Sequence, residues 1–139
     1  MAANSRFATG IHTLVLLATE PDTVQTSTDV ARKLNTNPVV IRRLLASLQK
    51  AELITSHKGP SGGSKLSRPS KSISLGDVYR AVESGPLFHS PKLADAVGSQ
   101  VARALVKVFA ESQKAIEVEL DQTSLSQLVK KIVKKPKED

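Results

Sequence analysis

The sequence predicts a mainly α-helical fold with a small β-wing, arranged as a winged helix-turn-helix domain followed by a long C-terminal helix. Three features predict it. Two short helical segments with capping residues are joined by a tight polar turn within residues 26–50. A glycine-rich hairpin pattern follows at residues 53–66, and apolar residues recur at helical spacing over residues 93–120.

Length and composition limit the protein to one domain, or to a small domain with an appended helical element. The chain has 139 residues, of which 40% are hydrophobic, 24% charged and only 3% aromatic. The complete absence of cysteine excludes disulfides, thiolate zinc sites, cysteine nucleophiles and all-cysteine iron–sulfur ligation. Because no segment reaches the roughly 18 apolar residues of a membrane span and no cleavable leader is evident, we expect a cytoplasmic protein without membrane contact.

The first helix is expected over residues 5–20 and ends at Pro21. Its apolar residues recur at spacings of three and four, which places one face of the helix toward the core. The members of this face are Phe7, Ile11, Leu14, Val15 and Ala18.

Capping residues mark the two helices of the helix-turn-helix. Thr26 with Asp29 three positions later forms a capping-box pattern at the start of a short helix. Asn37 followed by Pro38 is an N-cap with proline in the first helical position, where its missing N–H costs nothing. The second helix then extends over residues 38–50, with a buried stripe of Ile41, Leu44, Leu45 and Leu48.

This stripe determines which residues of the second helix face outward. Val39, Arg42, Arg43, Ala46 and Lys50 lie on the other side and must face solvent or a ligand. Arginine binds the guanine O6 and N7 atoms in bidentate fashion, and the first turns of a recognition helix contact base edges in the major groove. An ordinary exposed basic face is the alternative for an isolated helix; the helix-turn-helix favours a recognition helix.

A β-hairpin follows the recognition helix. Residues 53–57 are β-prone, residues 58–63 contain three glycines and a proline, and Leu66 belongs to the returning strand. A wing over residues 58–66 would place Lys58 and Lys65 near a sugar–phosphate backbone or a minor groove. A nucleotide-binding phosphate loop is disfavoured, because the spacing GxxxxGK[ST] is absent.

The C-terminal half begins with another capping pattern, Ser74 with Asp77, which opens a helix that ends near Gly85. After a linker, the helix over residues 93–120 would be about 40 Å long and should pack against a copy of itself. A last capped helix, residues 123–133, should fold back on it. The expected dimer contacts are Val97, Val101, Ala104, Leu105, Val108 and Ile116. We therefore divide the chain into residues 1–85 (winged helix-turn-helix), 86–133 (linker, long helix and packing helix) and 134–139 (a disordered tail of basic and acidic residues).

The basic charge is concentrated where the helix-turn-helix and wing are predicted. Residues 30–71 contain nine basic side chains and one acidic side chain, an excess of +8, while the whole chain has a net charge of +7. Such a local excess indicates a polyanionic partner, and double-stranded DNA fits the predicted fold. The candidate DNA-binding residues are Thr28, Arg32, Lys33, Asn37, Val39, Arg42, Arg43, Lys50, His57, Lys58, Gly59, Ser61 and Lys65.

With these elements in place, the sequence resembles the Rrf2 family of bacterial winged-helix transcription regulators, the IscR/NsrR-like proteins. Residues 58–63, KGPSGG, are similar to the family's RGPxGG wing, and residues 73–83 resemble its I-x-L-x-D-V…A-V-E block. Residues 6–8, RFA, resemble its R-Y-A start, and residues 48–54 its L-x-x-x-G-L-V segment. The resemblance implies a homodimeric repressor or activator on a palindromic operator, with Lys58 directed toward the minor groove.

The sequence departs from that family in the residues that would bind an iron–sulfur cluster and at two positions of the wing. Cluster-binding members have three cysteines between the fourth and fifth helices, whereas this chain has none, so we expect no iron–sulfur cluster and no cofactor. Lys58 stands where arginine is usual, and Ser64 where tyrosine is common. His89 beside Asp95 lies where relatives sense their signal, so the effector is expected to be a small molecule bound near there or a regulatory protein partner.

No pattern indicates catalysis, so we do not expect an enzyme. The three histidines lie on separate elements without metal-ligand spacing, and no Ser–His–Asp frame or carboxylate pair is evident. The favoured function is a sequence-specific DNA-binding transcriptional regulator, a repressor rather than an activator, acting as a homodimer. The alternative is a winged-helix protein-interaction module or a nonspecific nucleic-acid-binding protein.

Overall fold

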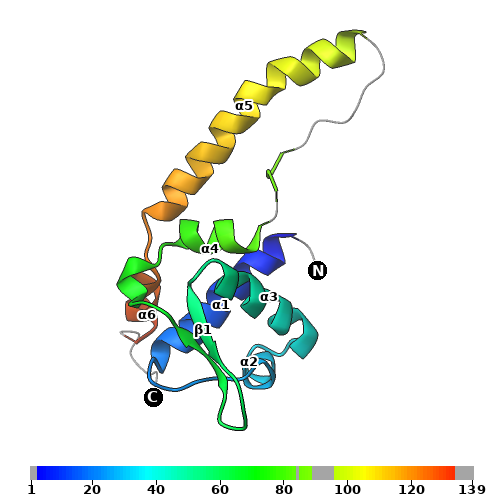
Figure 1. The fold of residues 1–139 in the computed structure, drawn as a ribbon. Coiled ribbons are helices and arrows are strands. Elements are labelled where there is room, and N and C mark those ends of the chain that lie inside the picture. Colours follow the sequence, from blue (N-terminus) through cyan, green and yellow to red (C-terminus); the bar gives the residue numbers. More distant parts are fainter. Residues whose placement is uncertain (1–2, 84, 89–95, 134–139) are drawn as a thin grey trace.

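The computed structural model describes residues 3–83, 85–88 and 96–133. The expected tail at 134–139, together with His89 and Asp95, lies outside the described residues. The chain forms a helical body with a two-stranded wing at one end and a long helix projecting at the other (Figure 1). The elements in chain order are α1 (Ala3–Thr19), α2 (Ser27–Lys33), α3 (Pro38–Lys50), β1 (Ile54–His57), β2 (Gly63–Leu66), the 3-10 helix η1 (Ser70–Ser72), α4 (Leu75–Val82), α5 (Ala96–Asp121) and α6 (Leu125–Val133).

The predicted caps form and set the helix starts. The hydroxyl of Thr26 accepts a hydrogen bond from the Asp29 backbone N–H (3.0 Å), and the Asp29 carboxylate accepts one from the Thr26 N–H (3.2 Å). The Asn37 side chain accepts from the Val39 N–H at 2.8 Å, with Pro38 in the first turn. Each cap satisfies N–H groups that a helix start otherwise leaves unpaired, so α2 and α3 begin where the sequence predicts.

The core forms between α1, α2, α3, β1 and α4, together with the start of α6. The predicted stripe on α3 is buried: Ile41 and Leu48 are fully inaccessible, and Leu44 and Leu45 are at most 8% exposed. The predicted core face of α1 is confirmed, since Leu14 is fully buried and the other four residues pack against the core, but the prediction missed Leu17 and Thr13, which are fully buried as well. The reason is that α1 lies in the middle of the body and contacts α3, α4, α6 and β2, so more than one of its faces is covered.

The wing is an antiparallel hairpin in the expected place. Ile54 pairs with Leu66 and His57 with Gly63, and the turn between them contains the glycine-rich segment. Residue Gln25, in the loop before α2, adds a short bridge to Ser64, with backbone hydrogen bonds of 3.0 and 2.8 Å. The wing is therefore hydrogen-bonded to the loop before α2, in addition to the hydrogen bonds between its own two strands.

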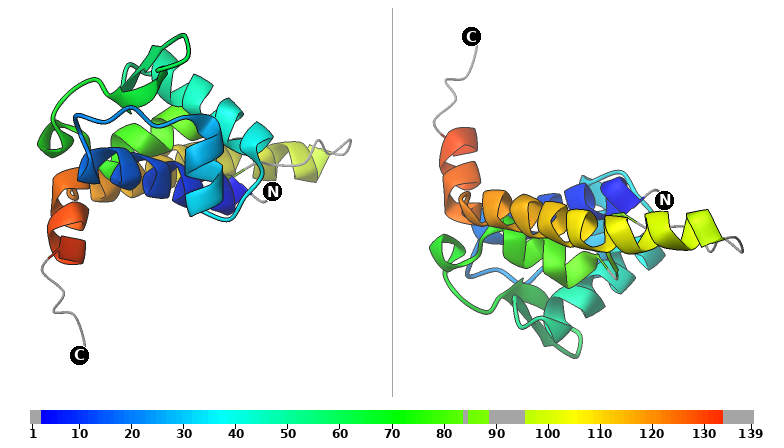
Figure 2. Two further views of the ribbon diagram at one scale, coloured as in Figure 1. Left: turned by 90° about the horizontal axis from the view of Figure 1, so that it is seen from below. Right: turned by 90° about the horizontal axis from the view of Figure 1, so that it is seen from above.

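The two C-terminal helices have different partners. Helix α5 packs on α4 through its C-terminal half, and its N-terminal half extends beyond the body (Figures 1 and 2). Helix α6 packs on α1 and η1, so the expectation that it folds back on α5 was wrong. Leu125 is fully buried in the core, and backbone hydrogen bonds from Leu75 to Thr123 (2.9 Å) and from Leu125 to Ile73 (2.8 Å) hold the start of α6 against the winged-helix body.

Candidate nucleic-acid interface

The outward face of α3 is open and basic. Val39 is 42% exposed, and Arg42, Arg43, Ala46 and Lys50 are exposed as well, opposite the buried leucine stripe. In the part of the chain that the structure describes, neither Arg42 nor Arg43 forms an ion pair with an acidic side chain. Both guanidinium groups are therefore free to bind an external anion or base edge.

A groove runs between α3 and the wing. Its volume is about 450 Å³, and it brings Arg42, Ala46 and Gln49 of α3 to the same cavity as His57 and Gly59 of the wing. The groove is further lined by Gln25, Thr26, Ser27, Leu45, Ser56, Gly62, Gly63 and Ser64. Gln49 Oε1 already accepts a hydrogen bond from Ser56 Oγ at 3.0 Å. The Arg42 guanidinium, the His57 imidazole and the Gln49 NH₂ group provide hydrogen-bonding groups suited to base edges and to phosphate oxygens.

Gln25 determines how the wing sits against the helices. It is only 3% exposed; its side-chain amide donates to the Leu16 carbonyl at 3.1 Å and accepts from Lys33 Nζ at 2.9 Å. Its backbone bonds to Ser64 require close approach of β2, and a Cβ on Gly63 would stand 2.8 Å from the Gln25 carbonyl carbon. Glycine at 63 is thus a steric requirement for this attachment.

Several predicted contact residues already have intramolecular partners. Arg32 pairs with Asp29 at 3.3 Å, although its side chain remains 70% exposed, and Lys33 is bonded to Gln25. Asn37 uses its side-chain oxygen to cap α3. These residues support the interface structurally, and an exposed pair such as Arg32–Asp29 is weak enough to exchange for a phosphate.

The remaining predicted residues are at least partly accessible to solvent. Lys58, Gly59 and Ser61 are exposed at the wing tip, where Gly59 has a φ of +102° that favours glycine. Lys65 lies half-buried on β2 opposite Thr55. Thr28 on α2, Lys50 at the end of α3 and His57 at the end of β1 are also exposed.

The structure separates two arginines that the sequence placed side by side. Arg42 lines the groove toward the wing, whereas Arg43 lies on the other flank of α3 beside Arg6 of α1. The sequence analysis did not predict that Gln25 and Gln49 line the groove beside the wing or that Arg6 lies on the other flank of α3. Gln49 follows Arg42 by two helical turns and was predictable from that spacing; Arg6 and Gln25 have no local signal, because tertiary packing brings them here.

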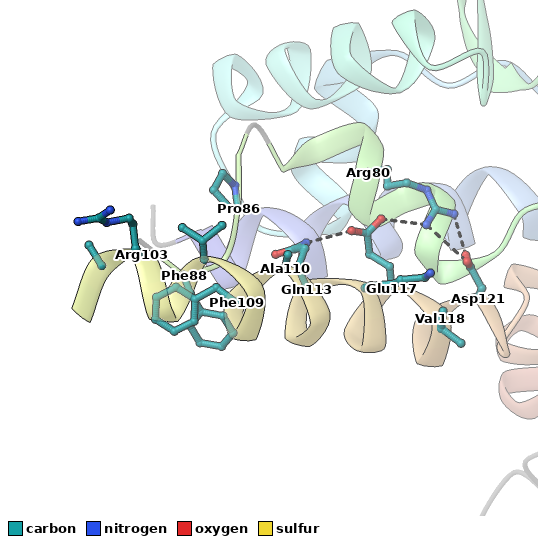
Figure 3. A pocket seen from close by; sticks show the side chains of 13 residues that line it. Arg80, Pro86, Phe88, Arg103, Phe109, Ala110, Gln113, Glu117, Val118 and Asp121 are labelled. Carbon is teal, nitrogen blue, oxygen red and sulfur yellow. Dashed lines mark hydrogen bonds and ion pairs between the residues drawn. The ribbon is translucent and has the colours of Figure 1, made fainter. Parts of the chain in front are cut away.

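A larger cavity lies between the segment after α4 and the projecting part of α5 (Figure 3). Its volume is about 780 Å³, and its walls are mainly apolar, with Phe88 and Phe109 stacked at 5.3 Å between ring centroids. Gln113 accepts a hydrogen bond from the Leu87 N–H (2.9 Å) and donates to Tyr79 Oη (3.0 Å). The cavity is thus held open by contacts between α5 and α4 with its following segment.

Arg80 connects α4 to α5 at the end of that cavity. Its guanidinium is bonded to Asp121 at 2.7 Å and to Glu117 at 3.1 Å (Figure 3). It is also bonded to Asp77 at 3.3 Å, and the Ser74 hydroxyl donates to Asp121 at 3.0 Å. The hydrogen bonds from Arg80 and Ser74 hold the pKa of the Asp121 carboxyl below its usual range. The hydrogen bonds from Arg80 to the carboxylates of Asp121, Glu117 and Asp77 raise the pKa of Arg80. These residues, the Arg80 cluster, join the long helix to the winged helix-turn-helix.

Part of the apolar stripe of α5 is exposed in the described structure. Val97, Val101 and Val108 are 69%, 49% and 52% exposed, Ala104 is exposed, and Leu105 is half-buried. Ile116, also expected on this face, is half-buried. A row of exposed valines along one helix is unusual for a monomer and is typical of an association surface.

Within the described ranges, no group of three or more histidine and acidic residues could hold a metal ion, and no helix is long and apolar enough to cross a membrane. Together with the missing cysteines, the residues present do not fit an iron–sulfur cluster.

Comparison with known proteins gives consistent matches. Residues 3–131 match the family model Rrf2, described as iron-dependent transcriptional regulator. The chain is 38% identical over 130 residues to the candidate HTH-type transcriptional regulator YwnA of Bacillus subtilis (strain 168), covering 91% of this chain and 96% of that protein. It is 29% identical over 105 residues to the HTH-type transcriptional regulator IscR of Cereibacter sphaeroides, and the match covers 73% of this chain and 68% of that protein.

Solved structures agree with the fold. The crystal structure of a candidate DNA-binding protein matches with a TM-score of 0.72 and 36% identity, covering 88% of this chain and 97% of that one. A candidate transcriptional regulator from Lactobacillus plantarum matches with a TM-score of 0.78 and 23% identity, and the match covers 93% of this chain and 90% of that one. The second likeness concerns the fold alone and confirms the predicted winged helix-turn-helix with a long C-terminal helix.

Proposed function

Because this chain belongs to the Rrf2 family of transcriptional regulators, which are not enzymes, we propose that it is a sequence-specific repressor that binds a palindromic operator as a homodimer. The observation that carries the proposal is the groove between α3 and the wing, in which Arg42 and Gln49 face His57 and Gly59. Such a regulator acts on DNA in the cytoplasm.

In this proposal α3 lies in the major groove and the wing, residues 58–66, on the backbone or in the minor groove. Arg42 contacts base edges, since it lies on the exposed face with no acidic partner among the described residues. Salt-dependent affinity comes from the surrounding cations, because each neutralised phosphate releases condensed counterions. These cations are Arg32, Lys33, Lys50, Lys58 and Lys65.

The homodimer is supported by the exposed valines of α5. A second copy packed along Val97, Val101 and Val108 would remove them from water and place two recognition helices in one molecule. Two recognition helices related by twofold symmetry require half-sites about one helical turn or more apart, which is why the proposed operator is palindromic.

The signal cannot be a cluster of the Rrf2 type, since the chain has no cysteine. A small molecule in the cavity between the segment after α4 and α5, or a regulatory protein partner, takes its place in this proposal. The cavity supports the first option because Arg80, Glu117 and Asp121 form part of its wall, and these residues join α5 to the DNA-binding half. An occupant that breaks these bonds would change how the two halves are held together.

The experiment is selection of genomic DNA fragments by the purified protein, followed by affinity measurements of the enriched fragment against salt. We expect an inverted repeat. Arg42→Ala should cost about 1–3 kcal/mol and relax the sequence preference, whereas Lys65→Ala should weaken binding to all duplexes evenly. Uniform salt-sensitive binding without an enriched motif would favour a nonspecific nucleic-acid-binding protein, and no DNA binding at low salt would favour a protein-interaction module.

A further inference from the structure

A second small cavity lies on the flank of α3 that faces away from the wing. Its volume is about 320 Å³, and it is lined by Arg6 of α1 with Val40, Arg43 and Leu44 of α3. Two arginines therefore line one cavity together with two apolar residues.

Neither arginine is neutralised within the described part of the chain. The ion pairs there involve Arg32, Arg68, Arg80 and Lys107, but not Arg6 or Arg43. Two like charges at one cavity repel each other, and the repulsion is stronger beside apolar groups than in bulk water. An anion bound between them would turn this repulsion into attraction, so the arrangement favours an anionic ligand.

Packing fixes the backbone positions of both residues. Phe7, next to Arg6, contacts the ring of Tyr79 edge-on at 5.4 Å between centroids, and this contact joins the N-terminal part of α1 to α4. Leu44, next to Arg43, is 2% exposed in the core. The two side chains therefore start from fixed backbone positions, and only their outer parts adjust when a ligand binds.

The position of the Arg6–Arg43 cavity relative to the wing indicates that the anion is a phosphate of the DNA backbone. The major groove is about 12 Å wide and an α-helix with side chains is about 10–12 Å across, so a helix seated there touches the sugar–phosphate backbones on both sides. The wing covers one flank of α3, on the side of Arg42, and the Arg6–Arg43 cavity lies on the other.

We propose that Arg6 and Arg43 together bind one backbone phosphate of the strand opposite the wing. This inference rests on the proposed function and adds Arg6 of α1 to the DNA-binding residues. It also changes the role of Arg43 from contacting bases to fixing the position of α3, because phosphate contacts set register and affinity without carrying sequence information. Arginine suits the task, since its planar fork binds two phosphate oxygens at once.

The test measures affinity for the selected operator duplex and for a random duplex over a salt series, using Arg6→Gln, Arg43→Gln and the double variant. We expect either single variant to lose roughly tenfold or more in affinity, equally on both duplexes. The slope of log K against log salt should change little in either single variant, because the remaining arginine still neutralises the shared phosphate, and should shrink by about 0.9 in the double variant. Lys71→Gln on η1 is the control with the same charge change, and thermal unfolding checks that each variant folds.

A second measurement replaces single backbone phosphates of the duplex by neutral methylphosphonates. One position, on the strand opposite the wing, should weaken wild-type binding and leave the double variant unaffected. Arg6→Lys should keep the salt slope while losing affinity, since lysine keeps the charge but not the fork.

The outcomes separate the two proposals. Wild-type protein that binds no duplex at low salt overturns the proposed function, and this inference with it. Wild-type binding together with an unchanged slope in the double glutamine variant overturns the phosphate site while the proposed function stands. A changed base preference in Arg43→Gln would show that Arg43 acts at a base edge. Additive losses in the double variant would show that the two arginines act on separate groups, and either result overturns the shared phosphate site.

Discussion

Gly63→Ala probes the attachment of the wing to the helix-turn-helix. The new methyl group would stand 2.8–3.0 Å from the C, O and N atoms of Gln25, all of which are backbone, and φ at this residue is +153°. Backbone atoms cannot rotate away as a side chain can, so β2 must shift and the two hydrogen bonds between Gln25 and Ser64 must lengthen. A strained non-glycine conformation costs about 1–3 kcal/mol, and each lost bond about 0.5–1.5 kcal/mol, so we expect a destabilisation of about 2–6 kcal/mol.

Urea denaturation followed by circular dichroism measures this loss, and two other glycines provide graded controls. Gly59→Ala adds a methyl group in open space at a φ of +102°, so it should lose only about 1 kcal/mol from strain. Gly85→Ala meets nothing within 4 Å and should lie within about 0.5 kcal/mol of the wild type. If Gly63→Ala is as stable as Gly85→Ala, the wing is not held through Gln25 and the steric argument is wrong.

Two further predictions concern the C-terminal helices. Leu125→Ala should lower the free energy of unfolding, measured by urea denaturation, by about 2–5 kcal/mol, because Leu125 is fully buried. Ile132→Ala is the control on the same helix; Ile132 is 57% exposed, so its replacement should change the free energy of unfolding by no more than about 0.5 kcal/mol. Equal losses in the two variants would mean that α6 does not contribute to the core. Asp121→Asn tests the Arg80 cluster: because the folded-state pKa of Asp121 is lowered, its carboxylate stabilises the fold above about pH 4 and loses this effect as the pH falls through the folded value. The variant should therefore be less stable than the wild type at pH 7 and closer to it at pH 3, and a difference that is constant with pH would contradict the assignment.

The local parts of the fold were predictable because their causes lie within a few residues. The caps at Thr26, Asn37 and Ser74 act on N–H groups two or three positions away, and all three form as expected. The stripe on α3 follows from helical periodicity, and all four of its predicted core residues are buried.

The C-terminal part was predictable only in outline. The length and exposed valines of α5 follow from its apolar pattern, but the same kind of pattern did not say which surface α6 would cover. An amphipathic helix needs only an apolar partner, and both α5 and α1 offered one. The backbone hydrogen bonds of Ile73 and Leu75 to the start of α6 selected α1, and those bonds join positions about 50 residues apart in the chain.

The sequence by itself determined the family, the winged helix-turn-helix and the basic surface, because caps, periodicity and the glycine-rich wing are encoded in short segments. The tertiary structure alone decided that Arg42 faces the wing while Arg43 faces Arg6, that Gln25 holds β2, and that Arg80 joins α4 to Asp121 on α5. Each of these contacts depends on how side chains from distant elements fill the shared core and fix the elements' relative positions.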